Sequence, residues 1–184
     1  MRIREIRKGD SKPLRLQYSY KTCAHYAVRI KNRKSGWLVS AVLEELPNET
    51  EKHFEEVLFA PHVEEPRVFV ASVDGEDVGW MEVGFQAWNN RLRLWEFLVK
   101  EEFRGRGIGR ALIRKAKAVA EEIGARMIVL ETQSCNVPAI GFYRSQGFDL
   151  IGMDVFAYSD RDIEEGEVRF EFGMRVGRNH RKAE

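Results

Sequence analysis

The chain has 184 residues, of which 43% are hydrophobic and 11% aromatic, and its formal net charge at pH 7 is +1. A chain of this length and apolar content can bury one sizeable core, so we expect a single domain over residues 1–177 and a flexible polar tail over residues 178–184. The near-neutral charge argues against a nucleic-acid partner, and no apolar run approaches the roughly 20 residues that span a bilayer, which argues against a membrane partner.

The N-terminal third of the chain has mostly β character. Residues 2–7 alternate Ile with charged side chains, which predicts an opening strand. Residues 25–30 and 37–43 are β-rich runs on either side of a polar turn, and they predict a hairpin. Residues 50–59 have helical spacing, with Thr50 as N-cap, and predict a helix.

Charge is unevenly distributed over this same part of the sequence. Residues 1–34 are rich in Lys and Arg, whereas residues 44–65 are rich in Glu. Solvated faces explain both runs. The alternative is that the acidic run lines a mouth that attracts a cationic amine.

The middle of the chain predicts a second hairpin and the strand that follows it. Residues 67–73 and 78–85 flank the turn Asp74-Gly75-Glu76-Asp77, which is a clear hairpin signal. Residues 92–99 then read as a further strand after a short polar turn.

A helix and three strands are predicted for the C-terminal half. Apolar residues recur at three- and four-residue steps and predict a helix that packs on the sheet and ends at Gly124. The apolar positions are Ile108, Leu112, Ala116, Val119, Ala120 and Ile123. Residues 127–132 read as a buried parallel strand, and residues 150–158 and 168–174 as two strands separated by a charged turn.

The junction between the strand at 92–99 and this helix is a candidate anion site. It reads Arg104-Gly105-Arg106-Gly107-Ile108-Gly109-Arg110. Glycines lack the Cβ that keeps a phosphate away from the backbone, so the N–H groups at the mouth of the helix can converge on an anion. The spacing matches neither a Walker loop, which needs Lys-Ser or Lys-Thr after its last glycine, nor a dinucleotide fingerprint.

A second motif follows the strand at 127–132. Asn136 is placed to cap a short helix, Pro138 lies in its first turn, and Gly147 supplies a left-handed stop. The motif is Asn-x-x-Ala-x-x-Phe-Tyr-x-x-x-Gly-Phe, at Asn136, Ala139, Phe142, Tyr143, Gly147 and Phe148.

In these two motifs the chain resembles the GCN5-related N-acetyltransferase (GNAT) family, whose Arg/Gln-x-x-Gly-x-Gly loop is filled here by Arg104, Gly107 and Gly109. The resemblance implies an α/β (α+β) fold, a mixed central sheet flanked by helices and splayed between the strands before and after the loop. It implies acetyl-CoA as cosubstrate, with its pyrophosphate on residues 104–110. Family members mostly have helices between their first two strands, so the β-rich segment 18–45 is a departure.

The same resemblance implies roles for individual residues. The backbone of Leu98 and Val99 would bind the pantetheine arm and the thioester oxygen. Asn136 would contact the pantetheine arm, although a pure capping role explains it equally well. Tyr143 would be the general acid that protonates the departing thiolate, and Glu96 the base that draws a proton from the amine. A core tyrosine and a solvent-facing strand glutamate are the alternatives.

The acceptor amine is less clearly indicated. Residues 130–148 most resemble the streptothricin acetyltransferase branch, which implies a cationic small molecule such as a streptothricin-like antibiotic or a polyamine. That branch tends to have Glu-Asp before the loop, whereas this chain has Glu96-Phe97, so a second carboxylate is missing. A protein N-terminal or lysine acetyltransferase and a non-catalytic acyl-CoA-binding sensor are the alternatives. The sequence leaves a homodimer open.

The N-terminal residues and the positions of Cys and His bear on the compartment and on metal binding. The charged start of the chain lacks the apolar stretch of a secretory signal, which favours a cytoplasmic protein. Cys23 and Cys135 are far apart and the histidines are scattered, so we expect free thiols and no metal site.

Overall fold

The computed structural model describes residues 1–9 and 14–177, which form two compact units. The first unit contains Met1–Leu16, Glu55–Leu130 and the described residues from Gly173 on. The second contains Gln17–Phe54 and Glu131–Phe172. A single domain over residues 1–177 stays a prediction, and the predicted tail 178–184 lies outside the described residues.

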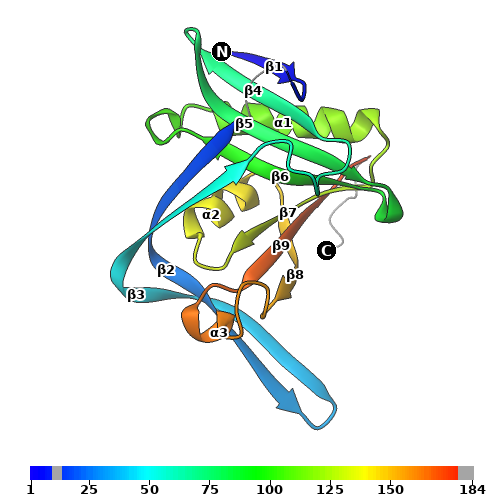
Figure 1. Cartoon of the computed structure of the whole chain (residues 1–184). Coiled ribbons are helices and arrows are strands. Elements are labelled where there is room, and N and C mark those ends of the chain that lie inside the picture. Colours follow the sequence, from blue (N-terminus) through cyan, green and yellow to red (C-terminus); the bar gives the residue numbers. More distant parts are fainter. Residues whose placement is uncertain (10–13, 178–184) are drawn as a thin grey trace. The chain divides into compact units, whose positions relative to one another are not determined.

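Within the described residues, a seven-stranded mixed sheet has the order β1-β4-β5-β6-β7-β9-β8 (Figure 1). Antiparallel pairing joins β1 to β4, β4 to β5 and β5 to β6, whereas β6 and β7 run parallel. The strands are β1 (Arg2–Ile6), β4 (Arg67–Val73), β5 (Glu76–Gln86), β6 (Arg91–Val99), β7 (Met127–Gln133), β8 (Asp149–Asp154) and β9 (Arg169–Arg175). The mixed sheet with flanking helices confirms the predicted fold class.

In the first unit, helix α1 (Ile108–Glu122) packs against β4, β5 and β6. The predicted apolar stripe is buried except at Ile123, which is 37% exposed because it lies just beyond the last helical residue. A Cβ at Gly79 of β5 would lie 3.1 Å from Ile108 and 3.3 Å from Leu112, so the close approach of helix and strand requires this glycine. Helix α1 therefore covers the face of β5 that carries Gly79.

The segment between β1 and β4 forms a long two-stranded ribbon of β2 (Arg15–Arg33) and β3 (Gly36–Val57). The hairpin predicted from residues 25–30 and 37–43 is confirmed, with longer strands. The helix predicted over residues 50–59 is wrong, because those residues continue β3 as far as Val57. The Tyr18 and Phe54 rings stack across the ribbon at 4.7 Å, so pairing with β2 overrides the local helical spacing.

The two charge runs of the sequence meet on this ribbon. Glu44 accepts hydrogen bonds from Arg29 at 2.7 and 2.9 Å. The Lys21 ammonium lies 3.9 Å from carboxylates of both Glu49 and Glu51. Oppositely charged side chains on adjacent strands stabilise a sheet modestly. Glu44, Glu49 and Glu51 of the acidic run therefore serve the ribbon, which weakens the idea that the run lines a substrate mouth.

The second unit also contains α2 (Val137–Ser145) and a short helix, α3 (Asp162–Glu165). Helix α3 lies in the segment that was predicted only as a charged turn. The buried Asp162 carboxylate accepts from the backbone N–H groups of Tyr158 (3.0 Å) and Ser159 (2.7 Å), and these bonds hold the turn together.

Candidate active site

The glycine-rich loop begins after a short 3-10 turn, η2 (Glu101–Phe103), and leads into α1. Gly105 and Gly107 both have left-handed backbones, with φ of 77° and 82°. A Cβ at either position would meet no described atom within 4 Å, so the space in front of the loop is open. Gly107 caps α1 without a side-chain hydrogen bond. The first N–H groups of α1 are therefore available to an anion.

Two of the loop arginines are held by contacts within the first unit. Arg104 donates from Nε to the Val99 carbonyl at 3.2 Å, which ties the loop to the end of β6. The Arg106 guanidinium lies 5.0 Å from the centre of the Phe103 ring. Arg110 is exposed on the first turn of α1. The loop thus combines positive charge with an open helix N-terminus, a combination that suits a pyrophosphate.

Strand β6 presents Glu96 and Leu98 on the face that α1 does not cover. Glu96 is opposite Glu82 in the antiparallel register with β5, Leu98 is opposite Trp80, and Val99 is opposite Gly79. The parallel register with β7 joins Arg91–Arg93 to Met127–Val129. The splay that the resemblance implies beside Leu98 and Val99 stays a prediction.

Glu82 is a buried carboxylate that the sequence interpretation missed. Its side chain has no exposed surface, and Oε1 accepts a hydrogen bond from the Phe59 N–H at 2.7 Å. Oε2 finds no hydrogen-bond partner among the described residues. Burial raises the pKa of Glu82, so its neutral form is favoured. The sequence feature that could have revealed it is a single glutamate inside the apolar run of β5.

In the second unit, α2 carries Asn136 at its N-cap and Tyr143 within the helix. Asn136 Oδ1 accepts from the Ala139 N–H at 3.2 Å, which confirms the predicted cap. Tyr143 is 7% exposed, and its ring meets those of Phe142 and Phe148 edge to face at 5.5 and 5.9 Å. These contacts hold the Tyr143 ring in one orientation.

A polar cluster lies around Gln133 and Cys135, just before α2. The sequence did not predict this cluster. The Tyr20 hydroxyl donates to Gln133 Oε1 at 2.7 Å and lies 3.3 Å from Cys135 Sγ. Gln133 donates in turn to Glu167, which also pairs with Lys52. Burial raises the pKa of the Cys135 thiol, so this thiol stays protonated. Cys135 and the exposed Cys23 are free thiols, as expected.

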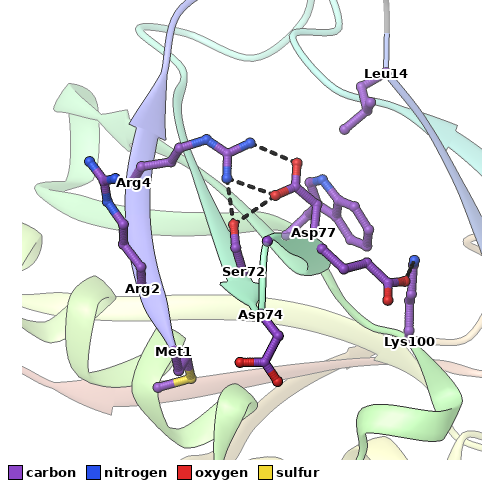
Figure 2. Close-up of a pocket in the computed structure, with 11 residues that line it drawn as sticks. Met1, Arg2, Arg4, Leu14, Ser72, Asp74, Asp77 and Lys100 are labelled. Carbon is purple, nitrogen blue, oxygen red and sulfur yellow. Dashed lines mark hydrogen bonds and ion pairs between the residues drawn. The ribbon is translucent and has the colours of Figure 1, made fainter.

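A cavity of about 920 Å³ lies at the end of the β4–β5 hairpin in the first unit (Figure 2). Its wall includes Trp80 and Lys100, so it reaches the strand end that follows Leu98 and Val99. Arg4 donates to both carboxylate oxygens of Asp77 at 2.7 and 2.6 Å and to Ser72 at 2.6 Å. These groups neutralise one another, so this part of the wall offers no net charge to a ligand.

Two tryptophans of the first unit differ in exposure. Trp80 is 9% exposed, whereas Trp88 is 84% exposed. No helix in the described part of the chain is long and apolar enough to cross a membrane.

Known proteins give an independent comparison. Residues 21–148 match the acetyltransferase (GNAT) family. The chain is 42% identical to the streptothricin acetyltransferase of Streptomyces lavendulae over 102 residues, which are 55% of this chain but only 53% of that protein, so the match spans about half of the relative's length.

Two solved structures match over nearly their whole lengths. Nourseothricin acetyltransferase superposes with a TM-score of 0.74 at 30% identity, over 96% of this chain and 98% of that one. A protein of Bacillus anthracis solved in complex with acetyl coenzyme A superposes with a TM-score of 0.74 at 25% identity, over 95% of this chain and 98% of that one. These likenesses extend over the ribbon as well as the sheet.

Proposed function

The chain belongs to the acetyltransferase (GNAT) family, and from that premise we propose that it transfers the acetyl group of acetyl-CoA to a primary amine. The observation that carries this proposal is the loop 104–107, in which two left-handed glycines leave open space before the N-terminus of α1, whose cap residue makes no side-chain hydrogen bond. A pyrophosphate needs such a place, because backbone N–H groups must approach its oxygens closely. The solved relative with acetyl coenzyme A supports this cosubstrate.

In the first unit, the proposed cosubstrate contacts are Arg104, Gly105, Arg106, Gly107, Ile108, Gly109 and Arg110. The backbone at Leu98 and Val99 would bind the pantetheine arm and polarise the thioester carbonyl. The family match supports their assignment.

Amine acetylation requires two proton movements. The amine nitrogen forms a bond to the thioester carbon, the carbon–sulfur bond breaks, the nitrogen loses a proton, and the departing thiolate gains one. We propose that Glu96 accepts the proton that the nitrogen loses, directly or through water. The Tyr143 hydroxyl donates the proton that the thiolate gains. Asn136 is proposed to contact the pantetheine arm while it caps α2.

For the acceptor, we propose a cationic small molecule such as a streptothricin-like antibiotic or a polyamine. The likeness to streptothricin and nourseothricin acetyltransferases supports this class. The sequence lacks the second carboxylate next to Glu96 that this branch tends to have. The fold places Glu82 opposite Glu96 instead, although complete burial keeps Glu82 from direct contact with an acceptor.

The decisive experiment is calorimetric titration with acetyl-CoA, followed by measurement of thiol release with streptothricin, polyamines, aminoglycosides and lysine peptides as acceptors. Binding with turnover on streptothricin or a polyamine is the expected result. Turnover on peptides alone would replace the proposed acceptor with a protein. Binding without turnover on any amine would favour an acyl-CoA sensor, and a lack of binding would overturn the role of loop 104–107.

A further inference from the structure

The loop between β3 and β4 is irregular and carries backbone strain. We call its residues 58–65 the strap. Phe59 and Glu65, near its two ends, both have left-handed backbones, with φ of 61° and 44°. A bulky residue such as Phe rarely adopts this conformation unless the surrounding structure holds it there. The contacts of Phe59 therefore matter.

The buried Glu82 side chain holds Phe59 in place. Its Oε1 accepts the Phe59 N–H at 2.7 Å, whereas its Oε2 has no partner among the described residues. Burying a carboxyl with only one hydrogen bond is unfavourable, and an apolar side chain of similar size would avoid this cost. The bond to the strap is thus what the carboxyl supplies and an apolar side chain could not.

The far end of the strap packs against the same two strands. A Cβ at Gly84 of β5 would lie 2.8 Å from the Glu64 carbonyl oxygen, 3.0 Å from Trp95 Nε1 and 3.1 Å from Val63. The His62 and Trp95 rings meet edge to face, with their centroids 5.0 Å apart. The strap is therefore held at both ends by residues of β5 and β6.

These contacts place the strap beside the proposed base. Side chains alternate along β5, so Gly84 shares the face of Glu82, opposite to the face on which Gly79 meets α1. Glu96 is opposite Glu82 on that face, and Trp95 precedes it in β6. The strap thus rests on two neighbours of Glu96, one across the sheet and one along the strand.

The charge of the strap has one sign. Glu64 and Glu65 are exposed, and residues 58–65 contain no Lys or Arg. The amine that attacks a thioester must be neutral, so these carboxylates would attract an acceptor through a second, cationic group.

We propose that the strap is a wall of the acceptor site and that Glu82 is the positioning residue that holds this wall beside Glu96. The inference rests on the proposed function, because it takes Glu96 as the base that the acceptor amine approaches. Glu82 is buried and acts through Phe59 rather than by contact with the acceptor. The acceptor class that fits the wall is an amine with at least one further positive charge.

Glu82→Met and Glu82→Gln test the positioning role. Met keeps an unbranched side chain but cannot accept the Phe59 N–H, whereas Gln keeps the accepting oxygen. We expect KM for the amine to rise about tenfold or more in Glu82→Met and to stay within about twofold of wild type in Glu82→Gln, with KM for acetyl-CoA unchanged in both. Val119→Ala, in the core side of α1, is the control for a general loss of stability and should change neither KM.

Hydrogen exchange measured by mass spectrometry follows the strap without any assay of activity. Backbone amides of residues 58–65 should exchange about tenfold faster or more in Glu82→Met than in wild type, and no faster in Glu82→Gln. Equal exchange in wild type and Glu82→Met would show that Glu82 does not hold the strap, and the proposal would fail.

Gly84→Ala displaces the strap from its other end and should also raise KM for the amine, because its Cβ would overlap the Glu64 carbonyl oxygen. Gly152→Ala is the matched control, since its Cβ would make only an ordinary contact of 3.8 Å with Glu171. A wild-type protein that binds acetyl-CoA but acetylates no amine would overturn the proposed function and the wall with it. Normal turnover with an amine KM that ignores both strap variants would overturn the wall alone.

The charge of the wall is tested with a diamine and the monoamine of the same chain length, putrescine and butylamine. Glu64→Gln/Glu65→Gln should raise KM for the diamine about threefold or more and leave KM for the monoamine close to wild type, because only the diamine keeps a cation when one amine is neutral. Equal changes for the two amines would mean that the strap does not select a second positive charge.

Discussion

Glu82 of β5 and Glu96 of β6 are directly opposite each other in the antiparallel register, on the sheet face that α1 leaves uncovered. Two carboxylates in such positions repel each other when both are charged. Burial raises the pKa of Glu82, which weakens this repulsion because its carboxyl stays neutral to a higher pH. We infer that Glu82 holds its proton to a higher pH in the folded protein than in the unfolded chain.

This inference predicts how Glu82→Gln changes the pH dependence of stability. Because the pKa of Glu82 is raised on folding, the folded protein holds more protons than the unfolded chain between the two pKa values, and stability falls as pH rises through that interval. Gln keeps an oxygen for the Phe59 N–H and carries no charge, so the variant should gain stability over wild type as pH rises from acid to neutral. Thermal melts across this range measure the difference.

A control with the opposite sign is Glu5→Gln. The hydrogen bond from Arg67 lowers the pKa of Glu5, so its contribution is present above its unfolded pKa and is lost as the medium becomes acid. Relative to wild type, this variant should lose a little stability at neutral pH and none in acid. If both variants show the same trend, Glu82 is not a neutral buried acid.

Glu96→Gln tests the proposed base. Removing a general base typically lowers turnover by about 10²-fold or more, so we expect kcat to fall by about that factor while KM for acetyl-CoA stays within about twofold of wild type. Glu101→Gln, at an exposed position of η2, is the matched control and should change neither constant. Turnover close to wild type in Glu96→Gln would show that the amine loses its proton without this residue.

Local signals made the loop and the capped helix predictable from sequence. The glycine loop before α1 and the Asn136 cap each depend on a few neighbouring residues, and the structure has the loop at the start of the helix and the cap as predicted. The anion-binding role of the loop stays a prediction. The β state of residues 50–57 was not predictable in this way, because it depends on pairing with β2 across the ribbon.

The position of Glu82 illustrates the same limit within the site. It is opposite Glu96 only because of the β5–β6 register, which shifts at an irregularity between Glu82 and Val83. A sequence pattern shows that β5 contains a glutamate, but it cannot fix which residue of the next strand lies beside it. The sequence therefore shows Phe97 next to Glu96 but does not indicate Glu82 across the sheet.

Gly107→Ala tests the anion cradle. Its Cβ would meet no described atom within 4 Å, so the expected loss of stability is that of an alanine in a left-handed conformation, about 1 kcal/mol. A bound pyrophosphate would meet that Cβ, and we expect KM for acetyl-CoA to rise about tenfold or more. Gly124→Ala is the matched control, since Gly124 is also left-handed with open space around it, but follows the far end of α1. Equal KM values in the two variants would argue against a cradle at Gly107.

Tyr143→Phe separates the proposed acid from a core role. The ring contacts with Phe142 and Phe148 survive the change, so thermal stability should stay close to wild type. Loss of the acid should lower kcat by about 10²-fold with little effect on acetyl-CoA affinity measured by calorimetry. Tyr18→Phe, which keeps its stacking on Phe54, is the control and should leave kcat close to wild type. Unchanged turnover in Tyr143→Phe would return this residue to the core.

Asn136 has two proposed roles that different substitutions separate. Its Oδ1 caps α2 through the Ala139 N–H, so Asn136→Ala should cost about 1 kcal/mol of stability, measured by denaturant unfolding. Asn136→Ser keeps a capping oxygen and should restore most of that stability. If the amide also holds the pantetheine arm, Ser is too short to replace it, and KM for acetyl-CoA should rise about fivefold or more in both variants. Recovery of both stability and KM in Asn136→Ser would mean that Asn136 is only a helix cap.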